Sequence, residues 1–138
     1  MNKHATIETT RQLIETDLAA SPDLCRACHS IVDFIAKKSD QHLQHLTFGI
    51  LTKVSGGSQE LGSRAISYLA GDRAQTLQMC FEFIDDRDQI YPLTTNEIQI
   101  ARKTGSFIHP ETGEAVPDFE KHIYIYFAPA WITDGVED

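Results

Sequence analysis

The first half of the chain has apolar residues at the spacing of amphipathic helices. Four apolar stripes follow one another over residues 5–71, separated by short polar segments. A serine–proline pair at 21–22 is typical of a helix start, with proline at the first helical position. In the third stripe, Ser39 or Asp40 can cap a helix that continues to Val54. The pattern therefore predicts about four helices.

In the second half the period of the apolar positions changes to two. Residues 76–84 alternate apolar and polar side chains, which predicts a half-buried strand with Glu82 on its wet face. The acidic run 85–88 is typical of a turn, and 89–93 would be a short partner strand. Residues 121–127 alternate again and are rich in tyrosine, isoleucine and phenylalanine, which predicts a further strand.

Residues 94–103 fit two structures. Ile98 and Ile100 alternate with polar residues, as in a strand, whereas Thr94 and Glu97 have the spacing of a helix capping box. The capping box favours a helix, and the strand stays as the alternative.

Helices followed by a mostly antiparallel sheet are typical of an α+β domain. We therefore predict one domain over residues 1–138, a usual domain size. It would have about four helices (5–71) packed on a sheet of three to five strands (72–130). A loose tail would cover residues 131–138.

The charge is unevenly distributed along the chain. The net charge is −8, yet residues 1–71 contain seven Lys/Arg and seven Asp/Glu. Residues 72–138 contain five basic and thirteen acidic residues. Because nucleic-acid binding depends on basic contacts to phosphates, this half disfavours nucleic acid as a partner. Its charge instead favours a basic protein partner, or serves solubility alone.

The sequence also indicates where the protein is found. No apolar run approaches the roughly 18 residues of a membrane span, and the first twenty residues lack the apolar core of a signal peptide. Three cysteines, an odd number, favour reduced thiols or a metal over a disulfide framework. We therefore expect a cytoplasmic protein with no membrane association.

The predicted sheet half supplies the candidate partner-binding surface. Its carboxylates and two tyrosines of the last strand would face solvent, a protein partner or a second copy of the chain. The candidate binding residues are Glu82, Asp85, Asp86, Asp88, Tyr124 and Tyr126.

Four residues of the helical half have nearly the spacing of a zinc site. Two residues separate Cys25 from Cys28, thirteen follow before His42, and two separate it from His45. The last gap is one residue short of the usual zinc pattern. No metal is the default, and zinc at these four residues is the alternative.

The run from Cys25 to His29 also matches the attachment pattern of c-type haem. Haem attachment normally requires export, and both cysteines fall on an apolar helix stripe, so the sequence does not favour haem. His109 and His122 could act as acid–base groups, but no nucleophile can be paired with them, so catalysis is not indicated.

These observations favour a small cytoplasmic interaction or regulatory module that binds a partner through its acidic sheet half. One alternative is a metal- or small-ligand-binding protein built on the cysteine–histidine set. The other is a winged-helix DNA-binding regulator, because two glycines join the third and fourth helices as in a helix-turn-helix. Arg64 is the single basic residue along 59–68, which is little for a recognition helix.

Overall fold

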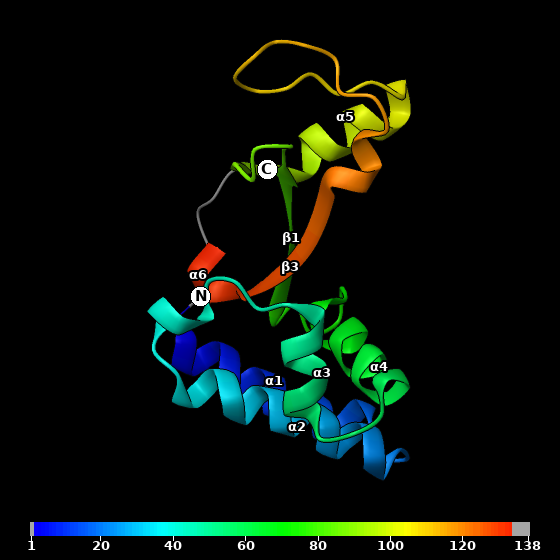
Figure 1. Cartoon of the computed structure of the whole chain (residues 1–138). Helices are drawn as coiled ribbons and strands as arrows, with labels where there is room; N and C mark the ends of the chain where they lie inside the picture. The colour runs from blue at the N-terminus through cyan, green and yellow to red at the C-terminus, as the bar shows by residue number, and fades with distance from the viewer. Residues whose placement is uncertain (1, 134–138) are drawn as a thin grey trace. The chain divides into compact units, whose positions relative to one another are not determined.

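The structure is a computed structural model that describes residues 2–133 of the chain (Figure 1). The chain forms two compact units. Unit 1 comprises, within the described part, residues 2–79 and 127–133, and unit 2 comprises residues 80–126. The chain passes from unit 1 to unit 2 inside one strand and returns inside another.

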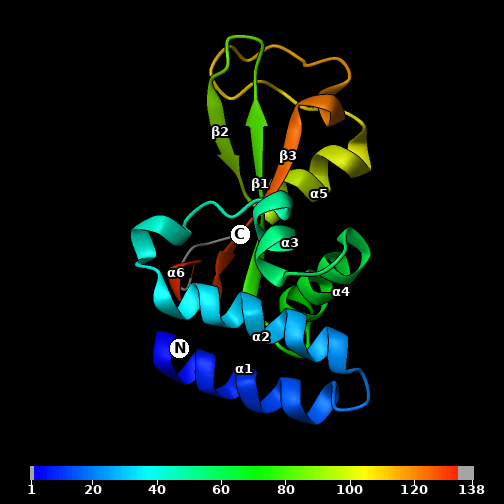
Figure 2. The same cartoon turned by 60° about the horizontal axis from the view of Figure 1, so that its bottom comes forward.

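Unit 1 is built from the four N-terminal helices. They are α1 (Lys3–Asp17), α2 (Pro22–Lys37), α3 (Phe48–Ser55) and α4 (Gln59–Ala70), with a 3-10 turn η1 (Asp40–Leu43) and the short α6 (Ala130–Thr133). α1 and α2 run side by side in opposite directions (Figures 1 and 2). Their apolar stripes, with those of α3 and α4, form one core that also includes Leu77 and Phe127.

The third expected helix is divided in two. A single helix from residue 40 to Val54 is wrong, because Leu46 pairs with Phe127 through both of its backbone groups, at 2.8 and 2.7 Å. Those groups cannot also join a helical ladder. The chain therefore leaves η1 and begins α3 at a new cap, where the Thr47 hydroxyl accepts the N–H of Ile50.

Unit 2 contains most of the sheet and its own core. The strands are β1 (Leu77–Ile84), β2 (Ile90–Leu93) and β3 (Ile123–Pro129), in the order β2-β1-β3. β2 runs antiparallel to β1, with Phe83 opposite Tyr91. The core residues of unit 2 are Phe81, Phe83, Leu93, Ile98, Ala101, Phe107 and Phe119.

The ambiguous segment after β2 is a helix, α5 (Thr95–Thr104). The favoured capping box is confirmed: the Thr94 hydroxyl accepts the N–H of Glu97, and the Glu97 carboxylate accepts the N–H of Thr94. Gly105 ends the helix in the left-handed conformation, at φ +72°. Another 3-10 turn, η2 (Phe119–His122), leads into β3.

The predicted α+β class is confirmed. Four N-terminal helices pack together and precede a three-stranded antiparallel sheet with further helices. The single-domain prediction stays a prediction, since two compact units can fold jointly or one after the other. Within the expected tail, Trp131 and Ile132 lie in α6 and pack on the core of unit 1, and residues 134–138 lie outside the described residues.

The alternation expected in β1 holds only in part. Leu77, Phe81 and Phe83 are buried as expected, but Met79 is 47% exposed and Glu82 only 7% exposed. The expectation that Glu82 faces solvent is therefore wrong. Three consecutive residues, 81–83, are buried, so both faces of the strand are covered there. None of the described helices is both long and apolar enough to cross a bilayer.

Candidate functional site

The turn between β1 and β2 is organised by one carboxylate. Asp85 Oδ1 accepts the backbone N–H groups of Arg87 and Gln89, both at 2.9 Å. Its other oxygen, Oδ2, is 2.9 Å from His109 Nε2. Although the turn lies at the surface, the side chains of Asp85 and His109 are only 12% and 11% exposed. The acidic turn is thus tied to a distant segment of unit 2.

The same histidine organises a second turn. Its Nδ1 accepts the backbone N–H groups of Glu111 and Thr112, at 3.0 and 3.1 Å. A backbone N–H can only donate, so Nδ1 carries no hydrogen and the neutral ring is protonated at Nε2. His109 therefore donates from Nε2 to Asp85. Both ring nitrogens are used within the protein, so His109 positions the two turns and is not free to act as an acid or base.

The ionisation of Asp85 follows from these contacts. The hydrogen bond from His109, together with those from the two backbone N–H groups, lowers the pKa of the Asp85 carboxyl despite its partial burial. Asp85 is therefore a carboxylate at neutral pH, held by three donors.

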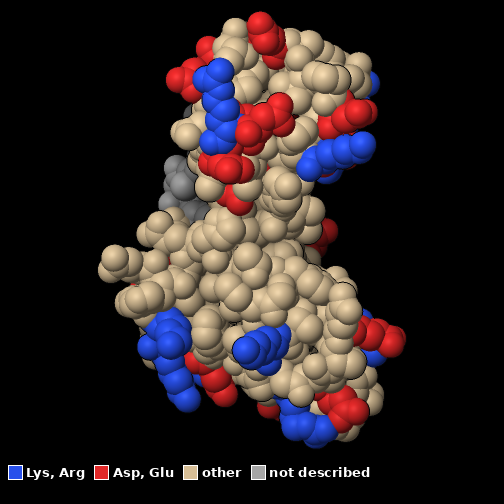
Figure 3. All heavy atoms as spheres, viewed as in Figure 1, with Lys and Arg blue, Asp and Glu red and all other residues tan. Residues whose placement is uncertain are grey.

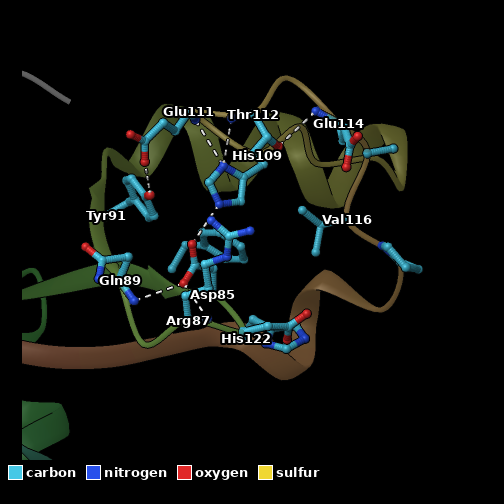
Figure 4. Close-up of a pocket in the computed structure, with 14 residues that line it drawn as sticks. Asp85, Arg87, Gln89, Tyr91, His109, Glu111, Thr112, Glu114, Val116 and His122 are labelled. Atoms are coloured by element: carbon cyan, nitrogen blue, oxygen red, sulfur yellow. Dashed lines mark hydrogen bonds and ion pairs between the residues drawn. The ribbon is translucent and has the colours of Figure 1, made fainter.

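An open pocket of about 630 Å³ lies beside the linked turns (Figure 4). Phe83 and Val116 supply apolar wall. The other side chains of interest in its lining are Asp85, Asp86, Arg87, Tyr91, His109, Glu111, Glu114 and His122. Four carboxylates thus face one guanidinium, which makes the pocket acidic. Acidic side chains also gather on the face of unit 2 shown in Figure 3, with a few basic ones among them.

Two side chains of the pocket lining, Tyr91 of β2 and Glu111, are hydrogen-bonded to each other. The Tyr91 hydroxyl donates to Glu111 Oε2 at 2.6 Å. This hydrogen bond, burial and the Glu111 charge raise the pKa of Tyr91 to about 12, so the phenol stays protonated at neutral pH. The Tyr91 and His109 rings also pack in a T-shaped arrangement, with centroids 5.1 Å apart. Tyr91 is therefore held in place in the pocket lining by its hydroxyl and by ring contacts with His109 and Phe83.

The structure places the six candidate partner-binding residues in different surroundings, with Glu82 buried in β1. Asp85 lines the pocket and is engaged by His109, whereas Asp86 and Asp88 are exposed. Tyr124 is 48% exposed on β3. Tyr126 is half-buried, and burial with the nearby Cys80 and Glu82 groups raises its pKa.

The four candidate zinc ligands are not brought together within the described residues. Cys28 is fully buried in the core of unit 1, and burial raises the pKa of its thiol to about 12. His42 Nδ1 is instead 2.8 Å from the Ser39 hydroxyl. A buried Cys28 is equally out of reach of a haem vinyl group. Cys25 lies elsewhere, in a group with Glu15 and His29.

That group was missed at the level of sequence. Its donor atoms, one from each of Glu15, Cys25 and His29, lie within 4.8 Å of one another. Cys25 and His29 are four residues apart, and residues at this spacing share a face of a helix. Glu15 comes from α1, close to the short turn that leads into α2. The spacing of Cys25 and His29, with the hairpin, was the available indication.

At the candidate pocket, Tyr91 was not singled out from the sequence, and neither the link between Asp85 and His109 nor that between Tyr91 and Glu111 was foreseen. Nothing in the sequence pairs Asp85 with His109, or Tyr91 with Glu111, because 24 and 20 residues separate them.

Comparison of the chain with protein-family models, with curated proteins and with solved structures gave no significant match.

Proposed function

We propose that the chain is a protein-interaction module whose unit 2 pocket receives a basic side chain of a partner protein. The observation that supports this most is the acidic pocket itself, with four carboxylates around an aromatic wall. Such a site suits the side chain of lysine or arginine, whose stem packs on rings while its charge meets carboxylates.

Two of the carboxylates are available to a ligand. Asp85 and Glu111 are already engaged by His109 and Tyr91. The side chains of Asp86 and Glu114 are exposed and, within residues 2–133, have no hydrogen bond or ion pair. A basic group entering the pocket can therefore bind them without breaking an existing contact.

The charge of the whole unit favours the same class of partner. Residues 80–126 contain nine Asp/Glu and four Lys/Arg. This excess of negative charge attracts basic proteins at separations up to a Debye length and repels a second copy of unit 2. We therefore assign the pocket to a different protein and not to self-association. The three cysteines form no disulfide with one another, which favours a reducing compartment such as the cytoplasm.

Labelled peptides test this function. Fluorescence anisotropy of a fluorescein-labelled Gly/Arg peptide is measured against the full chain, at low and at moderate salt, beside a Gly/Glu peptide of equal length. We expect the basic peptide alone to bind. The double variant Asp86→Asn/Glu114→Gln should weaken its binding by about tenfold or more, the usual scale for losing charged contacts.

A matched control separates the pocket from general charge. The double variant Glu8→Gln/Glu60→Gln removes the same charge from exposed positions of unit 1. Its affinity for the basic peptide should stay within about twofold of the wild-type value, because salt screens exposed charges that lie outside the pocket. Equal weakening by both double variants, or no binding of the basic peptide at low salt, would contradict the proposed function.

A further inference from the structure

We propose that Glu15, Cys25 and His29 form a binding site for a divalent metal ion of the zinc type, with a fourth ligand position open to water. The site belongs wholly to unit 1 and is independent of the function proposed for the unit 2 pocket.

The geometry of the α1–α2 hairpin brings the three donors together. Cys25 and His29 are one turn apart on α2, and Glu15 faces them from the last turn of α1. His29 Nε2 lies 2.8 Å from Glu15 Oε1, and each of the three donor atoms is within 4.8 Å of the others. The turn of residues 18–21 keeps the two helices in this register.

Those separations are close to what a metal ion needs. With zinc–ligand bonds of roughly 2.0–2.3 Å at tetrahedral angles, ligand atoms lie roughly 3.3–3.8 Å apart. The 2.8 Å contact between His29 and Glu15 must open slightly, and Cys25 Sγ, which is within 4.8 Å of both other donor atoms, needs at most a small shift. The Glu15 side chain is 69% exposed and can rotate freely, which makes this adjustment inexpensive.

The donor set indicates the class of metal. A thiolate disfavours calcium and magnesium, which prefer oxygen ligands, whereas thiolate, imidazole and carboxylate together suit zinc. Three protein ligands leave one tetrahedral position for water. The His29 side chain is 25% exposed and Cys25 is half-buried, so an ion can enter from solvent. Binding transfers the thiol proton of Cys25 to solvent as the metal–sulfur bond forms.

An ordinary hydrogen bond between His29 and Glu15 is the competing explanation of the same geometry. Such a pair needs no thiol beside it and predicts no response to metal. Cobalt(II) distinguishes the two, because it replaces zinc in tetrahedral sites. It then shows visible d–d bands, and a near-ultraviolet charge-transfer band if a thiolate is bound.

The experiment is a cobalt(II) titration of the reduced full chain, followed by displacement with zinc. We expect one equivalent of cobalt to produce both sets of bands and one equivalent of zinc to remove them. Cys25→Ser should abolish the charge-transfer band. Glu15→Gln and His29→Gln should each weaken binding by about tenfold or more, because losing even a residue that only supports a metal ligand costs about that much.

Two control variants make the assignment specific. Cys80→Ser removes a thiol of unit 2, and His42→Gln removes a histidine of the set expected from the sequence. Neither should change the titration. Circular dichroism of each variant checks that the helices are intact, which is expected because none of the three ligand side chains is fully buried.

A second measurement does not depend on cobalt. Zinc should slow the alkylation of Cys25 by iodoacetamide at least about tenfold, because a metal-bound thiolate is shielded, and should leave Cys80 unaffected. The proposal is overturned if the chain binds no stoichiometric cobalt, if the bands survive Cys25→Ser, or if His42→Gln abolishes binding while His29→Gln does not.

Discussion

Thr76 donates its hydroxyl hydrogen to Thr10 Oγ1 inside the core of unit 1. The two oxygens are 2.7 Å apart, and Thr10 Oγ1 is also 2.7 Å from the carbonyl oxygen of Thr6. A carbonyl can only accept, so the single hydroxyl hydrogen of Thr10 is used there. Thr76 must therefore be the donor of the pair. Both threonines are almost fully buried, and they join α1 to the residue before β1.

Because Thr76 donates and Thr10 accepts, removing the two hydroxyls should lower the unfolding free energy by different amounts. Thr10→Val leaves the buried Thr76 hydroxyl without its acceptor, and we expect a loss of about 1–3 kcal/mol of unfolding free energy. Thr76→Val removes only a donor and should cost about 0.5–1.5 kcal/mol. Urea unfolding followed by Trp131 fluorescence measures both, because Trp131 packs on the unit 1 core. If Thr10→Val costs no more unfolding free energy than Thr76→Val, the Thr76 hydroxyl has another acceptor.

The Asp85–His109 contact predicts a dependence on pH. Because the pKa of Asp85 is lowered in the folded protein, its ionised form contributes stability above the ordinary value of about 3.9. That contribution is lost as pH falls through the lower folded pKa. Asp85→Asn should therefore weaken unit 2 at neutral pH and make its stability less dependent on pH in the acid range. Urea unfolding followed by the NMR amide signals of unit 2 measures this.

The neighbouring carboxylate is the control for that experiment. Asp86 has no hydrogen bond within the part of the chain that the structure describes. The stability of unit 2 in Asp86→Asn should depend on pH as it does in the wild-type protein. If Asp85→Asn also keeps the wild-type dependence, the hydrogen bonds of Asp85 do not stabilise the folded turn.

Two glycines in helices should respond oppositely to alanine. A Cβ at Gly62 of α4 would lie 2.8 Å from Thr52 Cγ2 and 3.0 Å from Thr52 Cα on α3, whereas one at Gly49 meets nothing closer than 3.9 Å. Gly62→Ala should therefore cost about 1–3 kcal/mol through overpacking. Gly49→Ala should stabilise by up to about 1 kcal/mol through helix propensity. Trp131 fluorescence in urea measures both, and stabilisation by Gly62→Ala would contradict the close packing of α3 on α4.

The three thiols should differ in reactivity. Cys28 is fully buried with its pKa raised to about 12, while Cys25 and Cys80 are half-buried. Because the thiolate is the nucleophile, iodoacetamide should modify Cys25 and Cys80 in the native metal-free protein and spare Cys28. Mass spectrometry of the digested protein measures this, and urea should make all three react. Native modification of Cys28 at the rate of Cys25 would mean that α2 readily leaves the core.

Helix positions were predictable from sequence because their determinants are local. The capping box at Thr94 uses side chains three residues apart, and the Ser58 hydroxyl caps α4 by accepting the N–H of Leu61. The division of the third helix was not predictable. Its cause is the pairing of Leu46 with Phe127, a residue 81 positions later in the sequence.

The candidate site was less predictable than the fold. Alternation in β1 suggested an exposed Glu82, but burial on both faces depends on which distant segments cover the strand. The acidic turn was recognised from its composition, yet its link to His109 joins residues 24 positions apart. Cys25 was recognised as a candidate ligand through a zinc-like spacing, and the helix hairpin gives it different neighbours.

The route of the chain through the two units has a consequence for biosynthesis. Unit 1 is completed by residues that follow unit 2, since Phe127 lies in its core and the N–H of Ala130 donates to the carbonyl of Thr76. A ribosome therefore releases all of residues 80–126 before the last parts of the unit 1 core emerge. The helices made first must therefore wait for the strand made last, whereas residues 80–126, the described part of unit 2, are available for folding before the unit 1 core is complete.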